Sequence, residues 1–476
     1  MSHPAMPAGT DGREVTAADL ATRTRRRAAR TPHGIRDRLL RVTEEVPIAS
    51  VVIITALLLN VFAGRWSKMG IPLGPDRLLF AGGLILLLLD PRIPRPRARA
   101  LHGALIVFAA WTLGSMILTG ADTDSTYAFL DRVVMPFLLF ATAPMFLQGR
   151  IERLFLLRGL SMLGVYLTFT AVAESAGLHA LLFPRYIVAF ISDPRMSDAS
   201  LRANGPFLSG EANGMALALC AVAAFLLARL DRGGWRAAGL LVGPAATAAS
   251  VLSMTRSVWL GVALAVVTVV WSRRGLWQWI PFLAVAGAAV AVIGLAAVPD
   301  IADNIVERGS TSRSLDDRAN SNAGAMRAIA DDPLTGVGWG RFVRVGPDWV
   351  RQAEDYPVTT VNIEVHNVVL SRAAELGIPA ALLFTVILLA GPFAAILRRR
   401  TDPEAQDWRT ATTAATLIWF VPAMTSPIPY PFPTYVFFTF TGLLWAFPCK
   451  ESDDARRPLS TESDFHEARD TLESQE

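Results

Sequence analysis

The chain has 476 residues, of which 52% are hydrophobic and 18% are charged, and its mean hydropathy is +0.38. Long apolar segments recur along most of it, so the composition predicts a multi-span membrane protein rather than a soluble one. The net charge of +4 is small and the basic residues are scattered among short connections, which argues against a nucleic-acid-binding protein. The two cysteines, Cys220 and Cys449, are too few for a disulfide framework and lack metal-ligand spacing.

The two ends of the chain differ from its apolar middle. Residues 1–45 are polar and rich in arginine ("RTRRRAAR"), residues 450–476 are polar and charged, and no cleavable signal peptide is visible. We expect both segments to be disordered tails. Residues 46–449 between them form the predicted membrane domain, an all-α polytopic fold.

Apolar runs of about 17 or more residues, with allowance for short or broken ones, predict about twelve transmembrane helices. The predicted helices lie near residues 46–63, 77–89, 101–119, 128–147, 154–176, 213–230, 237–254, 257–271, 278–298, 366–397, 408–427 and 432–448.

Basic residues are distributed unequally between the two sides of this predicted helix set. The short connections of one side hold sixteen arginines, whereas those of the other side hold five basic residues. The positive-inside rule therefore predicts a plasma-membrane protein with both tails in the cytoplasm. Two long connections, residues 176–214 and the more polar 299–365, then lie outside. Because loops of this length are usually functional, we expect any chemistry on the external face.

The first candidate site residue is an arginine in "ASVLSMTRSVWLG" (residues 249–261). Arg256 is the only charged residue between 237 and 272. A charge at the bilayer centre costs about 2.5–3.5 kcal/mol on insertion scales, so we expect an external hairpin with residues 253–257 at its tip. Arg256 is then either an interfacial anchor or a fixed cation for a carboxylate or phosphate.

The second candidate stretch lies in the large loop, at residues 310–342. A capping-box-like start at Ser314 and a stop at Asp332-Pro333 predict an amphipathic helix on the membrane or against the spans. On its flank, Arg318 and Asn322 are spaced to present donors to a bound anion, although a local salt bridge from Arg318 to Asp317 is the alternative. The apolar stripe of this helix is predicted to be Leu315, Ala319, Met326, Ile329 and Ala330. For the "GVGWG" that follows, we favour a plain turn over a phosphate-binding nest.

The third candidate stretch is "NIEVHNVVLSRAAELGIPAALLF" (residues 362–384). His366 and Asn367 open a long predicted helix that Pro379 is expected to bend. The histidine is either a hydrogen-bonded interfacial side chain or a proton carrier. A fourth stretch, "RANGPFLSGEANG" (residues 202–214), is interpreted as a shaped loop that contributes Arg202 or Asn213 to the same outer surface.

Three acidic residues have ordinary interpretations. Asp122 and Asp124 form a pair of the kind that holds a metal in many lipid-sugar transferases, but no histidine is near and a solvated pair is favoured. Glu174, at the outer end of a predicted span, is expected to pair with an arginine. The sequence thus predicts no metal site.

Together these stretches resemble the O-antigen ligase and O-antigen polymerase superfamily. The resemblance rests on "SMTRSVWLG" at a span junction, an arginine-bearing helix followed by "DDPLTGVGWGRF", and "HNVVLSRAAELG" closing the loop. It covers roughly residues 204–389.

The resemblance implies a membrane-embedded glycosyltransferase with residues 46–449 as its catalytic domain and no metal or cofactor. Such an enzyme moves a glycan from a polyprenyl-diphosphate carrier to a hydroxyl of a lipid or glycan acceptor, among membrane lipids at the outer face. A chain-length regulator would be a further partner. Arg256 and Arg318 match the cations that stabilise the departing diphosphate, and His366 matches the base that removes or orients the acceptor proton. Asn367 and Glu375 match the same motif as supporting residues.

A transporter or flippase of lipid-linked glycans is the alternative function, since about twelve spans suit it equally well. A transporter is expected to have ionisable groups at mid-membrane and inverted repeats. Here the polar residues gather at the predicted outer surface, and no internal repeat is apparent. These features favour an enzyme.

Overall fold

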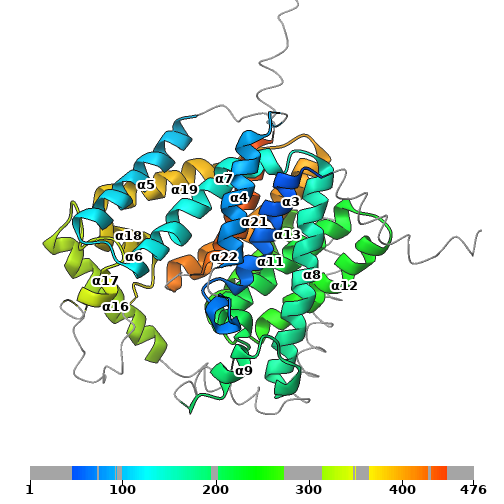
Figure 1. The fold of residues 1–476 in the computed structure, drawn as a ribbon, viewed down its shortest axis with the longest axis horizontal. Helices are drawn as coiled ribbons and strands as arrows, with labels where there is room; N and C mark the ends of the chain where they lie inside the picture. Colours follow the sequence, from blue (N-terminus) through cyan, green and yellow to red (C-terminus); the bar gives the residue numbers. More distant parts are fainter. Residues whose placement is uncertain are drawn as a thin grey trace, which may run out of the picture.

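The computed structural model describes residues 46–71, 74–91, 93, 99–194, 202–272, 313–346, 349, 364–426 and 430–447, with only the backbone of 313–317. Throughout these ranges the regular structure is helical, which confirms the predicted all-α class (Figure 1). In chain order, the helices are α3 (Ile48–Leu59), α4 (Pro75–Leu89), α5 (Ala100–Leu118), α6 (Thr123–Phe129), α7 (Met135–Phe146), α8 (Arg150–Ser175), α9 (Tyr186–Ile191), α11 (Gly210–Leu230), α12 (Gly234–Val251), α13 (Arg256–Ser272), α16 (Arg313–Asp331), α17 (Phe342–Val345), α18 (Val368–Leu376), α19 (Ile378–Leu388), α20 (Ala394–Leu397), α21 (Pro403–Thr425) and α22 (Pro431–Ala446).

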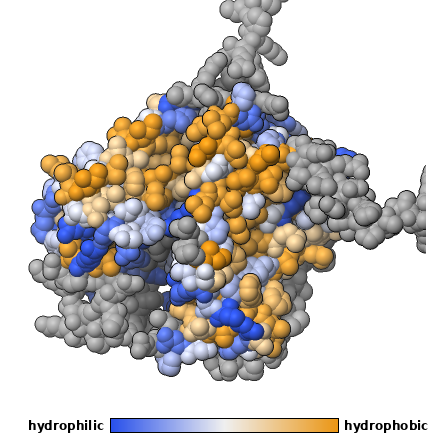
Figure 2. All heavy atoms as spheres, viewed as in Figure 1, coloured by the Kyte–Doolittle hydropathy of each residue, from blue (hydrophilic) through white to orange (hydrophobic). Residues whose placement is uncertain are grey.

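Several of these helices are suited to a membrane. Within the described ranges, five are long and apolar enough to cross one: Ala100–Leu118, Thr123–Phe146, Arg150–Ser175, Gly210–Leu230 and Ile378–Leu397. Figure 2 shows hydrophobic side chains gathered over α4, α5 and α8. The chain is therefore a membrane protein, whereas about twelve spans, the external loop and the orientation remain predictions. The predicted span at 278–298 and both predicted tails lie outside the described residues.

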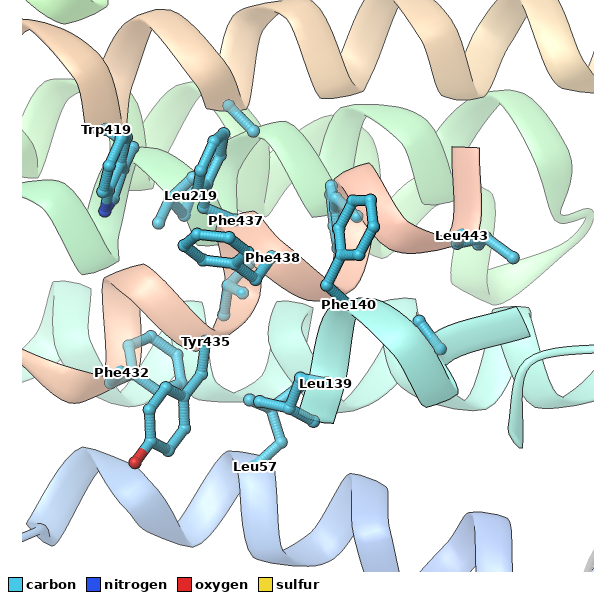
Figure 3. Close-up of a cluster of buried hydrophobic side chains, with 14 of the residues drawn as sticks. Leu57, Leu139, Phe140, Leu219, Trp419, Phe432, Tyr435, Phe437, Phe438 and Leu443 are labelled. Carbon is cyan, nitrogen blue, oxygen red and sulfur yellow. The ribbon is translucent and has the colours of Figure 1, made fainter. Parts of the chain in front are cut away.

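An aromatic core holds the helices together. α22 runs through its centre, between α21 and α11 on one side and α7 and α3 on the other (Figure 3). Phe437 stacks on Trp419 of α21, with 4.3 Å between ring centroids and 4° between ring planes. Phe438 makes an edge-on contact with Phe140 of α7. Gly442 lets α22 approach α7 closely, since a Cβ there would lie 2.2 Å from the Phe140 carbonyl oxygen.

The predicted helix at 366–397 is broken, and the break differs from the expected bend at Pro379. The chain leaves the helix at Gly377, which has φ +85° and ψ 166°, and Ile378 starts the new helix α19. A Cβ at Gly377 would lie 2.1 Å from the Leu334 carbonyl oxygen. Pro379 lies in the first turn of α19, where a missing N–H costs little. The predicted bend at Pro379 was wrong because the break at Gly377 depends on packing against the large loop. Pro379 does not cause the break; it is only tolerated in the first turn of the helix that follows.

The predicted loop helix exists as α16, but its apolar stripe was partly wrong. Ala319, Met326 and Ala330 are exposed, and the side chain of Leu315 lies outside the described residues. The buried face consists instead of Ala325, Ala328 and Ile329, which pack with Ala373 and Ala374 of α18. Small side chains allow the two helices to approach closely, so the contact face was not the most hydrophobic one.

We predict that Gly377→Ala destabilises the protein by on the order of 1–3 kcal/mol, because its positive φ and the Leu334 carbonyl exclude a side chain. Thermal unfolding of the detergent-solubilised protein measures the change. The control is Gly103→Ala in α5, where no described atom lies within 4 Å of the added Cβ. Equal midpoints for the two variants would contradict the proposed break at Gly377.

Candidate functional site

His366 lies just before α18 and faces α16. Its Nδ1 is 3.0 Å from Ser321 Oγ, and its backbone N–H donates to Asn322 Oδ1 at 3.2 Å. The Ser321 hydroxyl also donates to the Arg318 carbonyl oxygen at 3.2 Å. A serine hydroxyl has one proton, so with that proton on Arg318 the hydroxyl accepts from an Nδ1–H. This arrangement favours the neutral tautomer whose basic nitrogen is Nε2.

Asn367 begins α18 as its N-cap. Its Oδ1 accepts from the N–H groups of Val369 and Leu370, each at 3.0 Å. These two donors would otherwise have no partner in the first turn. Asn367 therefore fixes the start of α18, and with it the position of the neighbouring His366.

At the other end of α18, each of the last four backbone carbonyl groups has a hydrogen-bond donor. The carbonyl of Ala373 accepts from Gly377 N–H at 2.9 Å, and that of Leu376 accepts from Trp111 Nε1 at 3.2 Å. The two carbonyls between them, of Ala374 and Glu375, accept from the backbone N–H groups of Val337 and Gly338 at 2.9 and 3.0 Å. The "GVGWG" stretch is thus a strap across the end of α18. Two of its amides are used in this way, which is a structural role and not a nest for phosphate.

A tryptophan anchors the strap between α5 and α6. Trp339 is 1% exposed, and its Nε1 donates to the Ser125 carbonyl oxygen at 3.1 Å. Its ring faces the guanidinium of Arg372, 4.6 Å from the ring centroid. Arg341, which directly follows the strap, donates to the Thr119 carbonyl oxygen at 3.1 Å. These contacts place α16, α17, α18 and α6 in one group (Figure 1).

The loop before α11 is built on a buried glutamate. Glu174 of α8 accepts from the backbone N–H groups of Asn204 and Gly205, each at 2.9 Å, and from the Asn204 side chain at 3.1 Å. Its hydrogen bonds thus come from this loop, not from an arginine as expected. The fully buried Asn213, in the first turn of α11, donates to the Ala203 carbonyl oxygen of this loop at 2.9 Å. Asn213 therefore shapes the loop that carries Arg202.

A second glutamate, Glu211, joins the separate stretches into one site. It is 9% exposed, accepts from Ser257 Oγ at 3.2 Å and hydrogen-bonds with Ser426. Arg318 and Arg202 lie close enough to interact with it electrostatically. Sequence reasoning did not select Glu211 as a site residue. The available signal was its place as the only acidic residue of the long apolar α11.

A short turn at residues 252–255 joins α12 to α13, and Arg256 and Ser257, which were predicted at the tip of a hairpin, are instead the first residues of α13. That this turn faces outside stays a prediction. Arg256 is exposed, and it is the chain neighbour of Ser257, which donates to Glu211; the charges that act on Glu211 come from Arg318 and Arg202. Glu375 is buried and forms an ion pair with Arg372, at 3.5 Å between Oε2 and Nη1. The proposed local salt bridge from Arg318 to Asp317 involves a side chain outside the described residues.

Of the acidic pair near α6, Asp122 has a structural role. Asp122 caps α6 by accepting from Ser125 N–H at 2.7 Å, and it forms an ion pair with Arg344. Among the residues that the structure describes, no group of three or more His, Cys, Asp or Glu side chains is placed to hold a metal ion.

The family comparison matches the central part of this site. The O-antigen ligase family model matches residues 239–385. This segment is similar to the O-antigen ligase family. It contains α13, α16 and α18, with Arg256, Arg318 and His366, whereas Arg202 and Glu211 precede it. A search of curated proteins gave no match. The resemblance is thereby confirmed, and it indicates a membrane enzyme of the O-antigen ligase or polymerase type.

We predict that Asn367→Ala lowers the enzymatic activity and costs about 1 kcal/mol of stability, because α18 loses its cap. Asn367→Ser keeps an acceptor at the cap and should retain activity and stability. Thermal unfolding and glycan-transfer rates of the purified variants test this. Loss of activity in both variants without a change in unfolding would instead indicate direct substrate contact.

Proposed function

We propose that this protein transfers a glycan from a polyprenyl-diphosphate carrier to an acceptor hydroxyl at the outer face of the plasma membrane, with both termini in the cytoplasm. The O-antigen ligase family match supports the reaction class. The excess of basic residues in one set of predicted connections supports the orientation. The observation that carries the proposal is the contact of His366 Nδ1 with Ser321 Oγ, on the helix that bears Arg318.

In the proposed reaction, His366 acts as the base. The acceptor oxygen attacks the anomeric carbon of the donor sugar, and its proton moves to Nε2 of the imidazole. The bond from the anomeric carbon to the diphosphate oxygen breaks, and the polyprenyl diphosphate leaves with the electron pair. Ser321 keeps the imidazole in the tautomer that this proton transfer requires.

Arginine guanidinium groups would stabilise the charge that develops on the leaving diphosphate. Arg318 and Arg256 are the proposed partners of its oxygens, because a guanidinium binds phosphate through two parallel hydrogen bonds. Their charge serves the same purpose as a divalent metal, so we propose a metal-independent reaction. Arg202, on the loop that Asn213 supports, would contact the same diphosphate.

Glu211 would hold these cations in place. In its ionised form, Glu211 would reduce the repulsion between its two neighbouring arginines, Arg318 and Arg202, before the diphosphate binds. It is also joined to the start of α13 through Ser257. We therefore propose that Glu211 positions Arg318 and Arg202 and does not itself exchange a proton with the acceptor.

Product identification tests the proposed function directly. The purified protein is incubated with polyprenyl-diphosphate-linked glycans, alone and with candidate lipid acceptors. A longer glycan on the same carrier indicates a polymerase, and a glycan on a new acceptor indicates a ligase. Movement of the intact lipid-linked glycan across a vesicle membrane, without a new glycosidic bond, would instead support a transporter or flippase.

We predict that His366→Ala lowers the transfer rate by about 10²–10⁴-fold, the usual effect of losing a general base. Ser321→Ala should have a smaller effect, because the imidazole remains but loses the partner that orients it. His179→Ala, on the 3₁₀ turn after α8, is the matched control and should be active. A normal rate for His366→Ala in purified, folded protein would refute its assignment as the base.

We predict that Arg318→Lys and Arg256→Lys each lower transfer by about ten- to hundredfold, because lysine retains the charge but loses the paired hydrogen bonds. Arg327→Lys, also on α16, is the control, since Arg327 donates to the Trp349 carbonyl oxygen. Initial rates over a range of donor concentrations measure the effects. If Arg256→Lys has normal rates, then Arg256 is only an interfacial anchor.

A further inference from the structure

The segment that follows α8 turns back along that helix. The last turn of α8 closes on the Leu178 N–H, which donates to the Ala173 carbonyl oxygen at 2.8 Å, as in a Schellman motif. Five residues further on, the Tyr166 hydroxyl of α8 donates to the Phe183 carbonyl oxygen at 2.7 Å. Figure 1 shows α9, which comes next in the chain, beside the same end of α8.

The hydrogen bond from Tyr166 places Phe183 well below the end of α8. Tyr166 precedes Ser175, the last residue of α8, by nine residues, or about 14 Å along the axis at 1.5 Å per residue. Side chains on a helix lean toward its N-terminus, so the hydroxyl is at least as far from that end. With 26 residues, α8 is about 39 Å long, somewhat more than the roughly 30 Å of a hydrocarbon core. When α8 crosses a bilayer, Phe183 therefore lies at or below the boundary between headgroups and acyl chains.

The segment has a composition that suits this depth. Residues 175–184 contain no Asp, Glu, Lys or Arg. The side chains of Leu178, Leu181 and Phe183 are 50, 53 and 66% exposed. Pro184 has no N–H group, and the carbonyl before it is already paired with a hydroxyl, so neither group needs water as a partner.

The exposed side chains of this segment continue an apolar stripe on α8. The stripe consists of four side chains that are each about half exposed: Met162, Val165, Phe169 and Val172. Tyr166 lies on the same face, four residues after Met162 and three before Phe169. Because α8 is long and apolar enough to span a membrane, its exposed stripe faces lipid. An exposed apolar patch also suits a protein partner, but continuity with this lipid-facing stripe favours lipid.

We propose that residues 178–183 insert into the lipid leaflet at the Ser175 end of α8, with Leu178, Leu181 and Phe183 among the acyl chains. The connection 176–214, which was expected to lie outside, would then begin with a segment that re-enters the membrane. Arg185 follows directly, and its guanidinium donates to the His179 carbonyl oxygen at 3.3 Å. A long basic side chain at this point would hold its charge among the headgroups while the apolar neighbours are inserted.

Insertion would fix the height of the site loop in the membrane. The Tyr186 hydroxyl of α9 donates to the Pro206 carbonyl oxygen at 2.9 Å, and Glu174 of α8 accepts from Asn204 N–H. Both contacts are made with the loop that carries Arg202. This loop would thus be held beside the lipid headgroups, where the diphosphate of a lipid carrier lies. That consequence rests on the proposed function, whereas the insertion itself does not.

Collision measurements on spin labels test the insertion. The natural cysteines are replaced (Cys220→Ala and Cys449→Ser), and Leu181→Cys or Phe183→Cys is then labelled with a nitroxide. The labelled protein is reconstituted into phosphatidylcholine vesicles, and thermal unfolding confirms that each variant is folded. Collision rates are measured with oxygen, which concentrates among acyl chains, and with a water-soluble nickel chelate present on both sides of the membrane.

Two further labelled positions serve as references. Phe169→Cys reports on the lipid-facing stripe of α8, and Asp124→Cys reports on an exposed acidic position in the first turn of α6. We expect the labels at Leu181→Cys and Phe183→Cys to collide more often with oxygen than with the chelate, as at Phe169→Cys and in contrast to Asp124→Cys. Preference for the chelate at either position would overturn the proposal, because the segment would then lie in water. Shielding from both reagents would also overturn it, because a protein partner or a second copy would then cover the segment.

The Tyr166 hydroxyl provides a second test. In the labelled Phe183→Cys protein, Tyr166→Phe should shift the equilibrium from inserted to released segment by about two- to tenfold, the effect of one hydrogen bond. Collisions with the chelate should therefore rise relative to those with oxygen. Tyr435→Phe, which removes a buried hydroxyl from Asp131, is the matched control and should leave the ratio unchanged. Equal ratios in the two variants would overturn the assigned hold of Tyr166 on the segment. None of these measurements requires glycan transfer, so failure of the proposed function is recognised separately.

Discussion

The backbone hydrogen bonds of α18 are the constraint on which the rest of the site depends. A helix end in apolar surroundings needs hydrogen-bond donors for its last carbonyl groups, because no water is present there to donate to them. In this protein each of the last four carbonyls of α18 has a donor, from the chain break at Gly377, from the strap and from Trp111 of α5. The glycines of the strap follow from this requirement. A Cβ at Gly336, for example, would lie 2.6 Å from the Ala374 carbonyl oxygen. The large loop is thus bound to α18, and the proposed base His366 lies directly before that helix.

The sequence predicted the all-α class, which the structure confirms, and it proposed site residues that stay predictions. It failed where packing decided the outcome. Apolar runs predicted helices because hydrophobic length is a local property, and Arg256 stood out as a lone charge in such a run. The break at Gly377 and the buried face of α16 depend on residues distant in the sequence, so no local pattern indicated them. Glu211 was missed for the same reason. Its importance arises from Ser257, Arg318 and Arg202, which come from three other segments.

The charges of the site occur in balanced groups and not as a single positive patch. Arg132 with Glu364, Arg372 with Glu375, and Glu211 with its neighbouring arginines each combine opposite signs. Buried ion pairs contribute little net stability, since desolvation offsets most of their attraction. Their presence is easier to understand if they serve a ligand that is polar as well as charged. A phosphorylated glycan carried by a lipid is a ligand of this kind.

The contact through Ser321 has a consequence for how the site can fail. One hydroxyl joins the imidazole of His366 to the turn of α16 that begins at Arg318, while α16 itself packs on α18 through small side chains. A displacement of α16 by roughly the length of one hydrogen bond, about 3 Å, would withdraw the orienting partner of the base and the cation together. A displaced α16 would therefore stop the proposed transfer reaction altogether, because the base and the cation are lost in one movement.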